Sequence, residues 1–320
     1  MKAAVLHQLG TIPTYDDFPQ PIAENEQQVL IAVRAASIKQ LDLLKASGRH
    51  YTQYASLPTV VGVDGVGVLD NGQRVYAMGV TGMIAQQALV MKNRWVKLPE
   101  GIDNALAAAL PNALIGSDAA LRYRAKIKPG HTVLVNGATG ATGMIAVQAA
   151  KFHGASTVIA TGRNQATLQH LKTLGADETI SLEQPDEAII NQIEAIYERT
   201  QIDIVLDYLW GHPIELILQA LKTVKTHQHT KIVTVGEMAG ASISLESGIL
   251  RSKDIEFIGS GIGSLSLPMI GEYMQQHLPT MFQAAAEGKL RMAIEEVNLA
   301  DVTNAWAKAA RSGKRIVVKL

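Results

Sequence analysis

The pattern of apolar and polar positions changes about a third of the way along the chain. Up to about residue 115, short apolar runs such as residues 29–36 and 59–63 are separated by glycine-rich turns, which is typical of a β-rich region. From about residue 116, short apolar strands alternate with helical patterns such as residues 141–152 and 164–174. This alternation predicts a doubly wound sheet of parallel strands.

Further apolar runs extend the alternation before the pattern changes again near the end of the chain. The runs that predict additional short strands are residues 157–161, 203–207, 231–235 and 255–258. After Gly261, helical patterns cover residues 268–287 and 301–311, and residues 315–319 predict a last strand.

An apolar run that begins at Thr132 leads into a glycine turn and then into the predicted helix 141–152. The turn has the spacing Gly137-x-x-Gly140-x-x-Gly143, a variant of the dinucleotide fingerprint. A helix that begins after such a turn presents free backbone N–H groups and the positive end of its dipole to an anion. Gly140 would let the backbone approach a pyrophosphate, and Gly143 would let the helix pack close to the strand.

The next predicted strand, residues 157–161, ends without the acidic residue that usually binds the ribose 2′-hydroxyl of NAD. Arg163 lies just beyond this strand instead. The planar guanidinium suits a 2′-phosphate because it makes charge-assisted, bidentate contacts. The alternative is that Arg163 only begins a solvated helix. The missing acid and the glycine turn upstream favour phosphate recognition and therefore NADP(H) as the cofactor.

Composition and charge restrict the classes of function. The 320 residues are 47% hydrophobic and 18% charged, which supports a real core and argues against disorder. The net charge is zero, so no overall basic field favours nucleic acid or an anionic membrane. No run approaches the roughly 20 apolar residues of a membrane span. The N-terminus shows no secretory segment, and we expect a cytoplasmic protein.

Segments spread nearly end to end carry a resemblance to a known family. They are residues 1–5, 36–42, 57–67, 71–75, 97–101, 174–177 and 313–318, together with the glycine turn. With these segments the chain resembles the medium-chain dehydrogenase/reductase superfamily, and within it the zinc-free quinone oxidoreductases. The resemblance is specific for the superfamily and much less so for the substrate.

The resemblance implies an α/β architecture of two domains. Residues 1–115 and 262–320 would form a GroES-like, β-rich catalytic domain, and residues 116–261 a Rossmann NADP(H)-binding domain with a doubly wound parallel sheet. The active site would be the cleft between them. Members of the superfamily are commonly dimers or tetramers, so the resemblance implies a homo-oligomer, with a dimer favoured.

The chain departs from the zinc-dependent relatives at the metal-ligand positions. Lys39 stands where they carry the catalytic cysteine, Val63-Asp64 stands where they carry a His-Glu pair, and the later ligand position falls near Asn112. The four-cysteine structural zinc lobe is also missing, because the chain has no cysteine. An ammonium, a valine and an amide cannot build a tetrahedral Zn²⁺ site. We therefore expect a metal-free enzyme.

Two residues are the candidates for catalysis, and each has an alternative role. Zinc-free relatives often carry asparagine at the position of Lys39. The Lys39 side chain either points to solvent or faces the cleft, where it would act as a fixed cation or hydrogen-bond donor near a substrate carbonyl. Tyr51 is the best candidate to donate to the developing oxyanion, with Tyr54 as the near alternative. Either tyrosine is equally compatible with a rim or core position in which backbone groups satisfy its hydroxyl.

The resemblance and the chemistry of the motifs together predict the residues that bind the cofactor. Gly140, Ala141 and Thr142 are expected at the pyrophosphate. Thr161, Gly162, Arg163 and Asn164 are expected at the 2′-phosphate, Tyr208 by the adenosine end or the ribose, and Val235, Gly236 and Gly261 beside the nicotinamide.

The expected reaction is hydride transfer from NADPH to a small-molecule quinone or α,β-unsaturated carbonyl. Hydride addition to such electron-poor acceptors needs little acid catalysis, so a metal-free site with one oxyanion donor suffices. Two alternatives remain. One is a 2-enoyl thioester reductase, as other zinc-free relatives are, and the other is a catalytically weak NADPH-binding module, for which the substitution at Lys39 is the best support.

Overall fold

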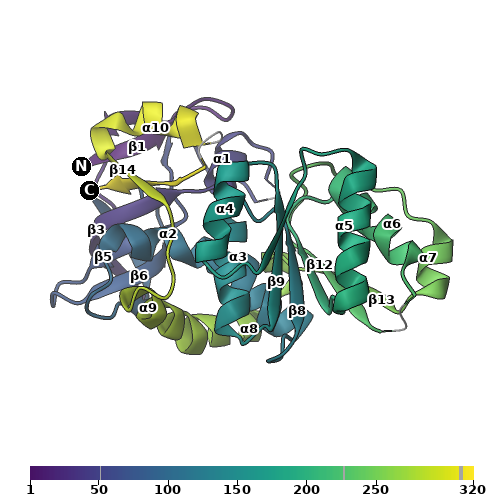
Figure 1. Cartoon of the computed structure of the whole chain (residues 1–320). Coiled ribbons are helices and arrows are strands. Elements are labelled where there is room, and N and C mark those ends of the chain that lie inside the picture. The colour runs from purple at the N-terminus through teal and green to yellow at the C-terminus, as the bar shows by residue number, and fades with distance from the viewer. Residues whose placement is uncertain (51, 226–227, 310–312) are drawn as a thin grey trace. The chain divides into compact units, whose positions relative to one another are not determined.

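A computed structural model of the chain describes residues 1–50, 52–225, 228–309 and 313–320 (Figure 1). The chain divides into two compact units. The first comprises Met1–Asn112 and Gly271–Leu320, and the second comprises Ala113–Ile270. The second unit thus begins slightly before the predicted residue 116 and extends past the predicted residue 261 to Ile270.

The first unit is built mainly from β-strands. One sheet has the order β2-β1-β4 and the other the order β14-β15-β3-β5-β6-β7. Because β3 pairs with both β5 and β7, and β6 joins these two, four strands form a closed circuit. The strands are β1 (Lys2–Leu6), β2 (Thr14–Asp17), β3 (Gln28–Ile38), β4 (Thr59–Val60), β5 (Asp64–Val68), β6 (Arg74–Gly79), β7 (Gln87–Lys97), β14 (Ile294–Asn298) and β15 (Arg315–Lys319).

Apolar side chains from these strands form one core. Ile31 and Val33 alternate with half-buried or exposed neighbours along β3, as expected for a strand with one face inward. Val75 of β6, Val90 of β7 and Ile316 of β15 are buried in the same cluster. Helices flank the strands; they are α1 (Gln40–Ala46), α2 (Asn104–Leu114), α9 (Leu278–Ala286) and α10 (Val302–Ala309).

The second unit contains a six-stranded parallel sheet in the order β10-β9-β8-β11-β12-β13. Helices α3 and α4 lie on one face of this sheet and α5 and α6 on the other (Figure 1). The strands are β8 (Thr132–Asn136), β9 (Thr157–Gly162), β10 (Glu178–Ser181), β11 (Ile204–Asp207), β12 (Thr230–Thr234) and β13 (Ile255–Gly259). The helices are the π-helix η1 (Ile115–Ala125), α3 (Ala141–Phe152), α4 (Gln165–Thr173), α5 (Asp186–Arg199), α6 (Gly211–Thr223), α7 (Ser247–Ser252), the short η2 (Ile262–Ser264) and α8 (Leu267–Glu272).

The predicted fold class is confirmed: a β-rich part accompanies a doubly wound Rossmann-type sheet. Helices cover both faces of this sheet (Figure 1). This explains the continuous apolar runs in the sequence, because strands buried on both faces are apolar throughout. Leu134 of β8, Val205 of β11 and Ile232 of β12 are fully buried in the centre of the sheet. Within the described residues, no helix combines the length and the apolar character needed to cross a membrane.

Three element predictions in the rest of the chain need correction. Helix α2 (Asn104–Leu114) was missed, because most of its residues are buried and apolar and it contains Pro111, a residue that usually breaks a helix. The strand predicted over residues 59–63 is only β4, two residues long. The helix predicted over 268–287 is α8, a π-helical turn η3 (Tyr273–His277) and α9 in succession.

Candidate functional site

The glycine turn connects β8 to α3 at the carboxyl end of the parallel sheet, where open α/β sheets bind ligands. Gly137 has φ +90°, a conformation that favours glycine. Gly143 is buried, and a Cβ there would lie 2.4 Å from the carbonyl oxygen of Gly137. Gly140, the N-cap of α3, is exposed, and a Cβ there would meet nothing closer than 3.9 Å. The turn therefore packs α3 tightly against the strand and leaves its first N–H groups approachable.

The crowding at Gly143 predicts a stability difference between two helical glycines. Gly143→Ala should lower the free energy of unfolding by about 1–3 kcal/mol, because the added methyl group meets backbone atoms that cannot move aside. Gly248→Ala in α7 is the matched control: nothing lies within 4 Å of its Cβ position. That control should be neutral or stabilising by up to about 1 kcal/mol from helix propensity. Equal unfolding midpoints in urea for the two variants would contradict the close packing.

The end of β9 packs against the glycine turn. A Cβ at Gly162 would lie 2.3 Å from the side chain of Thr139, so only glycine fits there. Thr161 is buried, and its hydroxyl is engaged by neighbouring residues rather than directed to solvent. Arg163 is exposed, and the described residues offer its side chain no ion pair or hydrogen bond. Arg163 thus directly follows the residue that packs against the glycine turn, and its side chain is exposed.

Asn164 has a structural role of its own. Its side-chain oxygen accepts a hydrogen bond from the N–H of Thr167 at 2.9 Å and caps α4. Asn164 thus stabilises the helix start that follows Arg163. Its predicted contact with a 2′-phosphate stays a prediction.

Three of the other predicted cofactor residues meet around Gly116, which the sequence did not single out. The Tyr208 hydroxyl donates to the Gly116 carbonyl at 2.8 Å, and burial raises the pKa of Tyr208 well above its ordinary value. A Cβ at Gly116 would lie 3.1 Å from the Thr142 side chain and 3.6 Å from that of Val235. Gly116 lies in the π-helix η1, and no sequence motif surrounds it. The small size of Gly116 lets η1 approach the start of α3 and the end of β12.

The remaining predicted residues lie at the end of β12 and beyond β13. A Cβ at Gly236 would come within 2.7 Å of the Tyr208 carbonyl oxygen, so the turn after β12 presses on the turn after β11. The N–H of Ser260 donates to the Thr234 carbonyl at 2.8 Å and ties the end of β13 to β12. Gly261, which follows, is exposed.

Lys39 is buried in the first unit with a side-chain exposure of 0%. Its ammonium donates to Asp64 Oδ1 at 2.9 Å and to the Ser37 carbonyl at 2.9 Å, and lies 3.2 Å from Asp42 Oδ2. The alternative in which Lys39 points to solvent is therefore wrong. Burial alone would lower the pKa of Lys39, but attraction to Asp42 and Asp64 outweighs it and raises the pKa above its ordinary value.

A second buried cation completes this charge cluster, which we define as Lys39, Asp42, Asp64 and Arg315. Arg315, on β15, interacts electrostatically with both carboxylates, and burial lowers the pKa of its guanidinium. Burial also raises the pKa of Asp64, against the effect of Lys39. Two cations and two acids make the charge cluster neutral. The opposite charges compensate one another, whereas burying charges of one sign alone would cost a large desolvation free energy.

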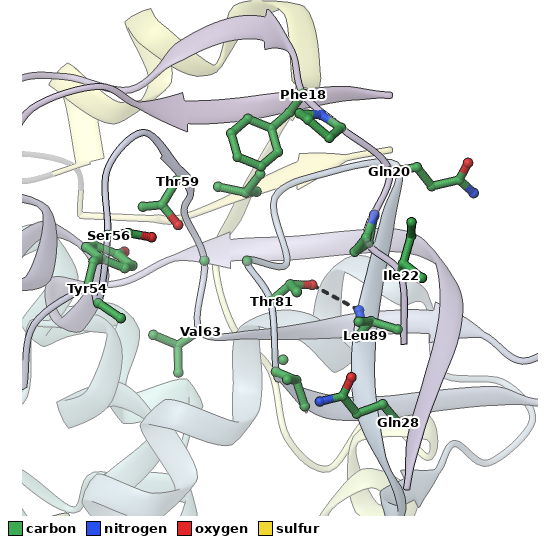
Figure 2. A pocket seen from close by; sticks show the side chains of 18 of the residues that line it. Phe18, Gln20, Ile22, Gln28, Tyr54, Ser56, Thr59, Val63, Thr81 and Leu89 are labelled. Carbon is green, nitrogen blue, oxygen red and sulfur yellow. Dashed lines mark hydrogen bonds between the residues drawn. The ribbon is translucent and has the colours of Figure 1, made fainter. Parts of the chain in front are cut away.

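A pocket of about 640 Å³ lies wholly within the first unit, a size typical of small-molecule sites. Figure 2 shows Tyr54, Ser56 and Val63 on one side of the space, with Thr81, Leu89 and Gln28 on the other. The lining mixes apolar side chains with hydroxyl and amide groups. The charge cluster supports this wall, because Asp42 Oδ1 accepts a hydrogen bond from the N–H of Val63 at 3.0 Å.

Of the two candidate tyrosines, Tyr51 lies outside the described residues. Tyr54 lines the pocket, and the Lys45 ammonium lies 4.8 Å from the centre of its ring. The Tyr54 hydroxyl is buried and has no hydrogen-bond partner among the described residues. Burial raises the pKa of Tyr54, so the hydroxyl stays protonated and can act as a donor.

The described residues bring together no group of three or more histidine, aspartate or glutamate side chains suited to a metal ion. At the positions matched to the zinc ligands, Lys39 and Asp64 are bound to each other. Asp64 Oδ1 is thus bound by an ammonium, and a metal-free site stays a prediction.

Comparisons with known proteins show what the chain is similar to. Residues 141–287 match the family described as zinc-binding dehydrogenase. A quinone oxidoreductase of Homo sapiens is 28% identical over 252 residues, covering 74% of this chain and 71% of the relative. A probable NADPH-dependent quinone reductase of Emericella nidulans is 26% identical and covers 96% of both chains.

One solved structure is similar to this chain over its whole length. The quinone oxidoreductase of Thermus thermophilus, also determined as its complex with NADPH, superposes with a TM-score of 0.78 at 27% identity over 100% of both chains. Together these similarities support a quinone oxidoreductase-like protein of the medium-chain dehydrogenase/reductase superfamily. The family match to zinc-binding dehydrogenases covers strands β9 to β13 of the parallel sheet but not β8, and it does not include Lys39, Val63, Asp64 or Asn112.

Proposed function

We propose that the protein is a zinc-independent, NADPH-dependent oxidoreductase that transfers a hydride to a quinone or an α,β-unsaturated carbonyl. One observation carries the proposal: the close-packed glycine turn meets the end of β9, which the exposed Arg163 directly follows, at the carboxyl end of the parallel sheet. The quinone oxidoreductase relatives support the same reaction class.

The residues at this edge of the sheet fit a dinucleotide phosphate. Open space at Gly140 leaves room for a pyrophosphate beside the N-terminus of α3, where Ala141 and Thr142 contribute backbone N–H groups. Arg163 would hold the 2′-phosphate by charge-assisted hydrogen bonds. When bound, NADPH supplies the hydride from its nicotinamide ring. Val235, Gly236 and Gly261 are proposed to border that ring.

The pocket of the first unit is proposed to hold the acceptor. The apolar side chains in its mixed lining suit a planar ring or an enone, and the Tyr54 hydroxyl is proposed to donate a hydrogen bond to the carbonyl oxygen on which negative charge develops. Water then protonates the enolate or quinol oxygen after the hydride has added to carbon. Lys39 is proposed to act through the charge cluster, by holding Asp42 and the Val63 wall in place.

The proposed activity is tested by the fall in NADPH absorbance with quinones, enones and acyl thioesters as acceptors. Turnover with quinones or enones, and none with thioesters, is expected. Turnover with thioesters alone would instead show a 2-enoyl thioester reductase. Tight NADPH binding without turnover would show a binding module. Removal of metal with a chelator should leave the activity unchanged, because the charge cluster occupies the ligand positions.

The role of Tyr54 has its own test. Tyr54→Phe should lower kcat/KM for the acceptor about tenfold to a hundredfold, because it removes the proposed oxyanion donor. Stability should not fall, since the lost hydroxyl has no partner among the described residues. Tyr15→Phe, an exposed tyrosine outside the pocket, is the control and should change neither quantity. Unchanged kcat/KM in Tyr54→Phe would leave Tyr51 as the candidate donor.

The proposal includes a cytoplasmic location and a homodimer. β13 is an edge strand of the parallel sheet and has backbone groups available for pairing with a second copy. Light scattering of the purified protein measures the oligomeric state directly.

A further inference from the structure

Three buried polar side chains at the carboxyl ends of adjacent strands form one chain of hydrogen bonds. Thr161, Asn136 and Asp207 belong to β9, β8 and β11, which are neighbours in the sheet, and each is at most 1% exposed. The Thr161 hydroxyl donates to Asn136 Oδ1 at 2.7 Å, and Asn136 Nδ2 donates to Asp207 Oδ1 at 2.8 Å. We define these three residues as the strand-end chain.

The strand-end chain reaches the glycine turn at its first end. The N–H of Gly137 donates to the Thr161 hydroxyl oxygen at 3.1 Å. The N–H of Ala138 donates to the Thr161 carbonyl at 2.7 Å. Thr161 therefore fixes the first two residues of the turn, and both functions of its hydroxyl are used within the protein.

At its other end, Asp207 fixes the turns after β11 and β12. Its carboxylate accepts hydrogen bonds from the N–H groups of Leu209 at 3.1 Å and Trp210 at 3.1 Å. Its backbone carbonyl accepts from Val235 at 2.8 Å and Gly236 at 3.3 Å. Asp207 forms no ion pair within the described part of the chain, so a fully buried acid is retained for hydrogen bonds alone.

The backbone that Asp207 holds is strained. Trp210 has φ +54° and ψ −158°, a backbone conformation that residues other than glycine rarely adopt. Gly211 follows with φ +55°, and a Cβ there would lie 2.7 Å from the Ala239 carbonyl oxygen. Such a conformation persists only where surrounding contacts determine it, and the Asp207 carboxylate supplies two of them.

We propose that Asp207, acting through Asn136 and Thr161, is a positioning residue that sets the shape of the dinucleotide site from the glycine turn to Val235 and Gly236. The inference rests on the proposed function. Among the described residues, the hydrogen-bond partners of the carboxylate are donors of the protein itself, so the carboxylate is not proposed to touch the nucleotide. The strand-end chain positions the backbone that meets the pyrophosphate and nicotinamide, parts that NADPH and NADH share. Arg163, in contrast, meets the 2′-phosphate that only NADPH carries.

This difference gives the inference a distinctive signature in binding. Asp207→Asn should raise the Kd for NADPH and the Kd for NADH by the same factor, about tenfold, the loss expected when one buried hydrogen bond is broken. The ratio of the two Kd values should stay unchanged. Both values are measured by titration of nucleotide fluorescence against the purified protein.

Two threonine-to-valine variants, at Thr161 and at Thr230, separate an effect on nucleotide binding from an effect on stability. Thr161→Val removes the hydroxyl without changing the shape of the side chain and should raise both Kd values about tenfold, whereas Thr161→Ser retains the hydroxyl and should restore them. Thr230→Val is the matched control: Thr230 begins β12 at the opposite end of the sheet, and its buried hydroxyl donates to the Ile202 carbonyl at 2.8 Å. It should lower the melting temperature of the free protein as Thr161→Val does, with both Kd values unchanged.

The outcomes that overturn the inference are distinct from failure of the proposed function. If the wild-type protein binds neither nucleotide, the proposed function fails and the inference fails with it. If the wild-type protein binds NADPH and Thr161→Val leaves both Kd values unchanged, only the inference fails. A rise in both Kd values in Thr230→Val equal to that in Thr161→Val would also overturn it, since general loosening of the sheet would then explain the effect.

Discussion

Replacing Lys39 by methionine should lower the free energy of unfolding by about 3–5 kcal/mol, because it leaves two buried carboxylates without their ammonium partner. Methionine has a similar length, so packing changes little and the lost charge dominates. Arg315 remains in the charge cluster, and its positive charge still compensates part of the negative charge of Asp42 and Asp64. Urea denaturation followed by circular dichroism measures the effect.

Two further variants test the origin of this loss. Lys2→Met removes an ammonium that pairs with Asp17 at 2.9 Å on the surface, and it should have little effect on stability because water already screens that pair. The double variant Lys39→Met with Asp64→Asn removes one of the two stranded carboxylates and should recover part of the loss. A Lys39→Met variant as stable as Lys2→Met would show that the cluster does not stabilise the unit.

The loss in Lys39→Met should depend on pH. In the wild-type protein the raised pKa of Lys39 means that its contribution is present at every pH below the ordinary lysine value and is lost only in strongly alkaline solution. In the variant the pKa of Asp64, already raised by burial, should rise further. The folded variant then binds a proton that the unfolded chain releases, so its stability increases as the pH falls toward about 4. The difference from the wild-type protein should therefore be largest at neutral pH.

The sequence predicted the second unit well because its strands and turns are governed by local rules. Helix α3 was expected over residues 141–152 and occupies Ala141–Phe152, since the glycine turn before it marks its start. The role of Gly143 also followed from the motif, and the Cβ position 2.4 Å from Gly137 gives it a physical basis. Helix α2 was not predictable in this way, because most of its residues are apolar and buried and Pro111 lies within it.

Side-chain partners were beyond the reach of the sequence. Lys39 and Asp64 are 25 residues apart; the resemblance placed both at metal-ligand positions, but it did not indicate that the two side chains pair with each other at 2.9 Å. The same holds for Gly116 and Tyr208, which are 92 positions apart and whose hydrogen bond depends on a π-helix. Asp207 ended a predicted strand, but its part in the strand-end chain depends on the order β9-β8-β11. Spatial neighbours of this kind arise from topology and not from spacing along the chain.

The choice between NADPH and NADH is expected to depend on Arg163. Arg163→Ala should raise the Kd for NADPH about tenfold to a hundredfold and leave the Kd for NADH nearly unchanged, because only NADPH carries the 2′-phosphate that the guanidinium would bind. The side chain is exposed and has no partner within the described residues, so its removal should not alter the free energy of unfolding.

Arg163→Lys refines the same measurement. Lysine keeps the positive charge but loses the planar fork, so an intermediate Kd for NADPH would show that bidentate contacts contribute beyond charge. High salt should weaken NADPH binding to the wild-type protein more than to Arg163→Ala, since an exposed charge pair is screened. If Arg163→Ala raised both Kd values equally, Arg163 would be acting on the shared part of the nucleotide, and the assignment of the 2′-phosphate to the end of β9 would be wrong.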